Sequence, residues 1–170
     1  MASQALTARE LRISQTCLTA KAFTERFYQR LNTERHLVKS MYEESGKLIF
    51  NGHGYCGPEA IGKFYENLPK CTPTIQGFDA HEIDEKYLGG TPAIVISVAG
   101  HVRYGNRGDP SSSSYDERST NLKGVLNFFE TFVITAKSGT WKIQSDSFRH
   151  QNCNTDSMLK ADSWNTSMQE

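Results

Sequence analysis

The chain has 170 residues, of which 37% are hydrophobic, so it can bury one core but not two independent ones. Nineteen Lys and Arg residues balance nineteen Asp and Glu residues. This balance lacks the basic excess that drives nonspecific binding to nucleic acid or to membranes. The first six residues carry no signal-peptide core, and no stretch approaches the roughly twenty apolar residues of a membrane span. We therefore expect one cytosolic or nuclear domain, with any contact to RNA indirect.

The cysteines and histidines form no pattern of a metal or redox site. The four cysteines, none in a C-x-x-C pair, are Cys17, Cys56, Cys71 and Cys153. In a reducing compartment this spacing is typical of free thiols. The histidines are equally scattered, at His36, His53, His81, His101 and His150. We predict no metal ion and no cofactor.

Two helices are predicted at the N-terminal end. Thr7 and Glu10 have the spacing of a capping box, and apolar residues then recur every three or four positions. This periodicity predicts one amphipathic helix over about residues 8–31. A short second helix is predicted to start from Thr33 as its cap, and Gly46 ends its pattern.

A hairpin and a third helix follow. Residues 48–50 form a short apolar run closed by Asn51-Gly52, a dipeptide that tolerates the positive φ angles of a tight turn. Pro58 suits the first position of a helix and Pro69 stops one, so we predict a helix over about residues 58–68.

Beyond this helix the apolar period changes to two. The predicted strands lie near residues 73–84, 92–104, 123–137 and 140–150. Helices followed by an antiparallel meander predict the α+β class. The polar, serine-rich segment 105–121 is predicted to be a mobile loop, residues 1–7 a flexible end and residues 152–170 a disordered tail, which leaves 8–151 as the folded domain.

Two of the predicted strands are apolar on both faces, although a sheet covered by helices on one side should be polar on the other. One face of the strand near 123–137 carries Leu126, Phe128, Phe132 and Ile134, and the opposite face carries Val125, Phe129 and Val133. The strand near 92–104 is similar. Because the chain has nothing left to cover a second apolar face, we predict a protein partner at Val125, Phe129 and Val133. The alternative is that strand curvature and the first helix bury both faces within the monomer.

Alternation places one set of side chains on the same side of the last strand: Trp141, Ile143, Ser145, Ser147 and Arg149. Arg149 would then lie within a sheet surface. A buried guanidinium without an acceptor is very costly. We therefore expect Arg149, next to Ser147, to form an ion pair with a carboxylate of the partner.

A catalytic site is the competing interpretation. Its nearest candidate residues are Asp79, His81, Asp84 and Tyr104. Alternation turns several of these outward, and the sequence offers no recognisable set of nucleophile, base and orienting group. We therefore favour partner binding over catalysis.

Several motifs together carry a family resemblance over about residues 14–151. They are Cys17-Leu18-Thr19-Ala20, Phe27-Tyr28, the run from Leu48 to Gly52, the helix from Gly57 to Pro69, and Trp-Lys-Ile-Gln-Ser-Asp-Ser-Phe-Arg-His-Gln at 141–151. In these the chain resembles the nuclear transport factor 2-like export factors, the small subunits that pair with the large metazoan mRNA-export receptor, nuclear export factor.

The resemblance implies a cone-shaped fold in which three helices pack on a curved, mostly antiparallel sheet. It also implies a heterodimer formed through that sheet, whose complex carries mRNA through nuclear pores by binding Phe-Gly nucleoporins and shuttles between nucleus and cytoplasm. By similarity, Arg149 is the residue that pairs with an aspartate of the receptor. Asp79 stands where the family also has an aspartate facing the partner.

Two alternatives come from the same superfamily. One is a homodimeric carrier that imports the GTPase Ran in its GDP form, and the other is a small-molecule enzyme such as a steroid isomerase. Arg149 has no obvious partner in a second copy across a two-fold axis, which favours a different mate.

Overall fold

The computed structural model describes residues 7–105, 124–137 and 139–151. The predicted loop at 105–121, except Gly105, and the predicted tail at 152–170 lie outside the described residues. The predicted flexible end does so too, except Thr7. Within the described ranges, no helix combines the length and hydropathy that crossing a membrane requires.

The predicted helices are present, but the second ends at Met41 and is followed at once by strand β1 (Tyr42–Phe50), so the prediction that Gly46 ends it was wrong. Helix α1 spans Ala8–Thr33, and its capping box is confirmed because Thr7 Oγ1 accepts from Glu10 N while Thr7 N donates to Glu10 Oε2. The second helix, η1 (Arg35–Met41), is a 3₁₀ helix preceded by Glu34. Thr33 does not cap it, since its hydroxyl donates back to Gln29 O within α1.

The third helix, α2 (Pro58–Asn67), begins at a proline as predicted and ends just before Leu68-Pro69. A further 3₁₀ turn, η2 (Glu85–Leu88), joins two of the strands, and the side chain of Asp84 caps it.

In the described part of the chain, six strands form one sheet in the order β2-β1-β6-β5-β4-β3. They are β1 (Tyr42–Phe50), β2 (His53–Cys56), β3 (Cys71–Ile83), β4 (Ala93–Tyr104), β5 (Gly124–Lys137) and β6 (Thr140–His150). All neighbours are antiparallel except β1 and β6. The predicted α+β architecture is therefore confirmed, including the tight turn between β1 and β2, where Asn51 and Gly52 both have positive φ.

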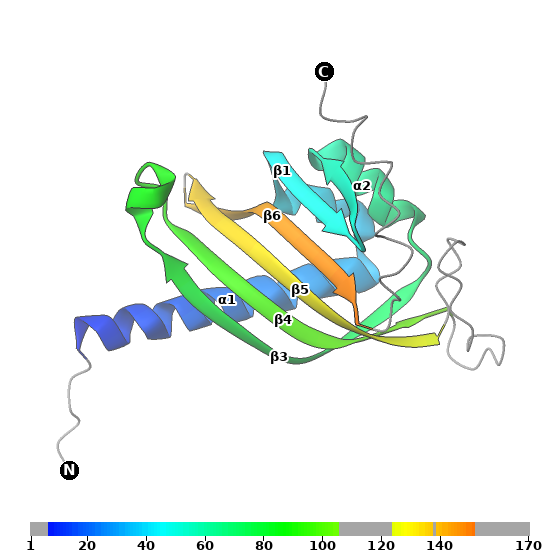
Figure 1. The fold of residues 1–170 in the computed structure, drawn as a ribbon, viewed down its shortest axis with the longest axis horizontal. Coiled ribbons are helices and arrows are strands. Elements are labelled where there is room, and N and C mark those ends of the chain that lie inside the picture. The colour runs from blue at the N-terminus through cyan, green and yellow to red at the C-terminus, as the bar shows by residue number, and fades with distance from the viewer. Residues whose placement is uncertain (1–6, 106–123, 138, 152–170) are drawn as a thin grey trace, which may run out of the picture.

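Helices cover a single face of this sheet. Helix α1 runs behind β3, β4 and β5 in Figure 1, so the view looks onto the opposite face. The buried side of α1 inserts aromatic rings into the core; Phe27 meets Phe132 of β5 edge to face, with ring centroids 4.8 Å apart. The aromatic residues thus fill the inside of the cone.

A β-bulge corrects the predicted alternation of the last strand. Val133 pairs with Ser145, but Ile134 pairs with Ile143, so Gln144 is an extra residue in β6. Ile143 is consequently fully buried in the core, whereas Ser145 lies on the opposite face. Trp141 also packs against the core, so the prediction that Trp141, Ile143 and Ser145 share one face of the sheet was wrong.

Candidate functional site

The side chains of β1 and β3–β6 that point away from the helices form one continuous surface, which we call the outer face. Pairing across the sheet orders it in rows. One row consists of Asp79, Ser97, Thr131, Ser147 and Ile49. The rows beside it consist of Ala99, Phe129 and Arg149 on one side, and of Val95, Val133 and Ser145 on the other. Val125 lies further along β5.

All six residues predicted for a partner interface lie on the outer face. Phe129 and Arg149 are direct cross-strand partners. Asp79 and Ser147 lie in the same row across the sheet, but Asp79 is three strands away from Ser147. Val133 and Val125 complete the set on β5. For Val125, Phe129 and Val133 this location follows from the alternation predicted from the sequence, whereas the bulge at Gln144 sets it for Ser147 and Arg149.

Apolar side chains on the outer face remain accessible in the single chain. Val125 is 48% exposed, Phe129 is 42% exposed and Ile49 is 45% exposed, while Val133 and Arg149 are half-buried. The alternative that the monomer hides both faces of the sheet is therefore wrong for these positions.

The residues weighed for catalysis do not come together. Asp79 and His81 point to the outer face, whereas Asp84 caps η2 at the end of the sheet. Tyr104 is buried inside the cone, where its hydroxyl lies 3.1 Å from His150 Nε2. These four residues therefore share no common site.

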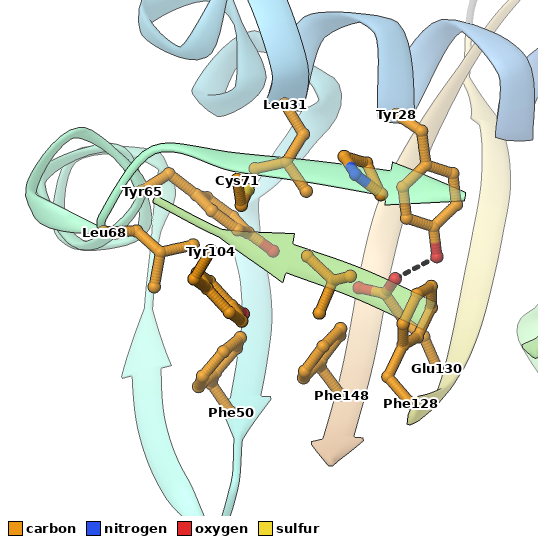
Figure 2. Close-up of a pocket in the computed structure, with 12 residues that line it drawn as sticks. Tyr28, Leu31, Phe50, Tyr65, Leu68, Cys71, Tyr104, Phe128, Glu130 and Phe148 are labelled. Carbon is orange, nitrogen blue, oxygen red and sulfur yellow. Dashed lines mark hydrogen bonds between the residues drawn. The ribbon is translucent and has the colours of Figure 1, made fainter. Parts of the chain in front are cut away.

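Sequence reasoning missed a buried acid pair inside the cone. Glu130 of β5 and Asp146 of β6 are 1% and 0% exposed, and tyrosine hydroxyls from three other elements donate to them. Tyr28 of α1 donates to Glu130, as Figure 2 shows. Tyr42 donates to Asp146 Oδ2 at 2.5 Å, and Tyr65 of α2 donates to the same oxygen at 3.4 Å.

Burial changes the acidity of every member of this cluster. Removal from water raises the pKa of Asp146 to about 7, against the opposing effect of its hydrogen-bond donors. It also raises the pKa of Glu130 well above the usual range, and the adjacent Asp146 adds to that shift. The pKa values of Tyr28, Tyr42 and Tyr65 are raised by burial too, so these hydroxyls stay neutral donors.

The space beside the acid pair is too small for a substrate. The cavity that Figure 2 displays, lined by Tyr28, Tyr65, Tyr104 and Glu130 among apolar residues, holds about 10 Å³. That is room for roughly one water molecule, whereas ligand sites usually hold about 300–1,000 Å³. The arrangement suits a closed, hydrogen-bonded core.

Comparison with known proteins settles the family. A model of the nuclear transport factor 2 (NTF2) domain matches residues 19–150. The chain belongs to the NTF2 family. The predicted family fold, three helices on a curved and mostly antiparallel sheet, is thereby confirmed together with the resemblance on which it was based.

Relatives of this NTF2 chain carry names from nuclear transport. NTF2-related export protein 2 of Mus musculus is 27% identical over 139 residues, covering 82% of this chain and 89% of the relative. Nuclear transport factor 2 of Oryza sativa subsp. japonica is 26% identical over 132 residues, covering 76% and 92%. Among solved structures, the chain is similar to the Chaetomium thermophilum Mex67 NTF2-like domain complexed with Mtr2, with a TM-score of 0.60 and 19% sequence identity. The match covers 79% of this chain and 98% of that chain. This last likeness shows the fold alone.

One signal in the sequence could have revealed the acid pair of this NTF2 chain. Alternation along β5 places Glu130 between Phe128 and Phe132 on the core-facing side, and an acidic residue in such a series calls for a buried partner. Asp146 gave no comparable signal, because the bulge at Gln144 decides which way it points.

Proposed function

We propose that this chain is a non-enzymatic adaptor in nuclear export that pairs, through its outer face, with the NTF2-like domain of a large export receptor. The observation that carries the proposal is the exposed apolar surface at Val125, Phe129 and Ile49 on a sheet that helices cover from one side only. Exposed apolar patches of this kind on a folded domain mark interaction sites.

The size of the outer face suits a stable protein interface. Five strands about 4.8 Å apart make it about 20 Å wide, and the stretch from Val125 to Val133 makes it about 27 Å long. That scale is comparable to the roughly 800 Å² that each partner buries in a standard complex. The short side chains of Ser97, Thr131 and Ser147 in the central row let a second sheet approach closely.

The charges on the outer face favour a partner other than a second copy. Arg149 adjoins the apolar centre beside Phe129, and Asp79 contributes a carboxylate three strands away. A two-fold axis near Phe129 would bring two copies of Arg149 close together, which costs energy unless a carboxylate separates them. A receptor domain with an acidic residue at this position avoids the conflict.

The names of the relatives agree with this role. Export proteins are among them, and the solved neighbour pairs one NTF2-like domain with a second protein. In the proposed complex, this chain contacts mRNA only indirectly, and the heterodimer binds the Phe-Gly nucleoporins. The chain shuttles between nucleus and cytoplasm with the receptor.

The deciding experiment measures the mass of the purified chain by light scattering, alone and after co-expression with the NTF2-like domain of an export receptor from the same organism. We expect a 1:1 heterodimer with the receptor domain. A tight homodimer that ignores the receptor domain and binds Ran-GDP would instead assign the carrier function.

A further inference from the structure

Glu130 and Asp146 lie next to each other on the core side of the two central strands. Glu130 pairs across the sheet with Phe148, and Asp146 pairs with Phe132, so the two acids are diagonal neighbours on adjacent antiparallel strands. The two carboxyl groups are close enough to alter each other's pKa, and both residues are essentially excluded from solvent.

No cation compensates this pair among the residues that the structure describes. The groups that face it are the hydroxyls of Tyr28, Tyr42 and Tyr65, from α1, β1 and α2. The other titratable groups of the core are engaged with each other. His150 Nε2 lies 3.1 Å from the Tyr104 hydroxyl, and Arg35 of η1 donates to Cys71 Sγ at 3.1 Å.

Two adjacent carboxylates without a cation would place two negative charges in a dry core, which costs more than a protein of this size can offset. Asp146 Oδ1 is buried and receives no hydrogen bond from any hydroxyl, amide or cation in the described structure. A proton on Glu130 removes one of the two negative charges. It also supplies a hydrogen-bond donor to Asp146, because a carboxylic acid donates where a carboxylate only accepts.

We propose that Glu130 and Asp146 form a buried proton-binding site, which holds one proton between the two carboxyl groups in the folded protein at neutral pH. The raised pKa of each acid, caused mainly by burial, agrees with this site. The site lies directly beneath the outer face, because Phe129 and Thr131 flank Glu130 and point outward. Its occupancy therefore controls the stability of the strands that carry that face.

The sign of the pH effect follows from proton counting. Both acids are ionised in the unfolded chain above about pH 5, whereas the folded protein keeps the proton on Glu130. Unfolding then releases a proton from the pair, so the contribution of the pair to the unfolding equilibrium constant rises about tenfold per pH unit from about pH 5 toward pH 7. This stabilising contribution is present at low pH and is lost as the pH rises through the folded pKa of the pair.

The test compares urea unfolding of the wild type and of Glu130→Gln between pH 5 and pH 8. The glutamine amide donates to Asp146 as the protonated acid does, so the variant should fold. We expect the ratio of the wild-type to the variant unfolding constant to rise about tenfold per pH unit from pH 5 to pH 7. Other titrating groups, His150 included, are common to both proteins and cancel in the ratio.

Glu82→Gln is the matched control, because Glu82 is exposed and accepts a hydrogen bond from the Thr16 hydroxyl of α1, away from the acid pair. Its ratio to the wild type should stay constant over this range. A constant ratio for Glu130→Gln as well would overturn the proposal.

Infrared spectroscopy provides a second measurement that needs no variant. The folded wild type at pH 6 should show the carbonyl band of a protonated carboxyl group, and this band should disappear on unfolding at the same pH. A folded protein without the band contains no shared proton, and the proposal would then be wrong.

Discussion

Phe129 of β5 and Arg149 of β6 are direct cross-strand partners, and both side chains lie on the outer face of the sheet. Phe129 is 42% exposed and Arg149 is half-buried beside it. The pair thus combines an accessible ring with a guanidinium held on a rigid strand. Aromatic and arginine side chains in this arrangement are typical of binding hot spots.

Phe129→Glu is expected to abolish pairing with the receptor domain while the free chain still folds. The new carboxylate is tolerated in the monomer because the position is exposed and Arg149 lies opposite, but it cannot be buried against an apolar partner. Light scattering reports pairing, and urea unfolding reports folding. Leu18→Glu on α1, at a position 59% exposed and outside the outer face, should leave pairing unchanged. An unfolded Phe129→Glu monomer would place Phe129 in the core instead.

Arg149→Ala is expected to weaken the heterodimer by about 2–5 kcal/mol, since it leaves a buried carboxylate of the receptor without its partner. Titration calorimetry with the receptor domain measures the loss. Arg26→Ala, an exposed arginine of α1, is the control and should not change the affinity. Equal affinities for wild type and Arg149→Ala would remove Arg149 from the interface.

Gly100→Ala is expected to destabilise the fold by about 1–3 kcal/mol, because overpacking in a core forces neighbours apart. A Cβ atom at Gly100 would lie 2.4 Å from the carbonyl oxygen of Thr74 and 3.1 Å from the ring of Phe128. The carbonyl belongs to β3 beside its bulge and cannot move without distorting the sheet. Gly54→Ala, where nothing lies within 4 Å, should change the free energy of unfolding little, and equal effects at both sites would refute this explanation.

His150 should make the fold sensitive to acid. Burial lowers the pKa of His150 to about 4, so between this value and the unfolded pKa of about 6.5 the unfolded chain binds the extra proton. Stability from this residue is present above pH 6.5 and is lost as the pH falls, by about 2 kcal/mol between pH 7 and pH 5.

Urea unfolding of the wild type and of His150→Gln tests this sensitivity. The variant lacks the titrating ring, so its deficit in unfolding free energy at pH 7 should shrink by about 2 kcal/mol at pH 5. His53→Gln, at an exposed histidine of β2, serves as the control. A deficit that stays the same at both pH values would show that His150 does not titrate as its burial implies.

Local chemistry in the sequence was sufficient to predict most of the elements and the outward side of β5. The Thr7 and Glu10 capping box, the Asn51-Gly52 turn and Pro58 act within a few residues of themselves, so no tertiary context is needed to interpret them. Alternation along β5 likewise assigned Val125, Phe129 and Val133 to one face. The role of that face in binding stays a prediction.

The hydrogen bonds inside the cone could be identified only from the tertiary structure. Asp146 meets Tyr42 across 104 residues of sequence, and Glu130 meets Tyr28 across 102. The single extra residue at Gln144 sets which way the side chains of β6 point, and no local pattern in the sequence marks that bulge. A buried hydrogen bond depends on positions in three dimensions, whereas caps, turns and alternation depend on neighbours along the chain. The acid pair could therefore be found only once the strands and helices were packed together.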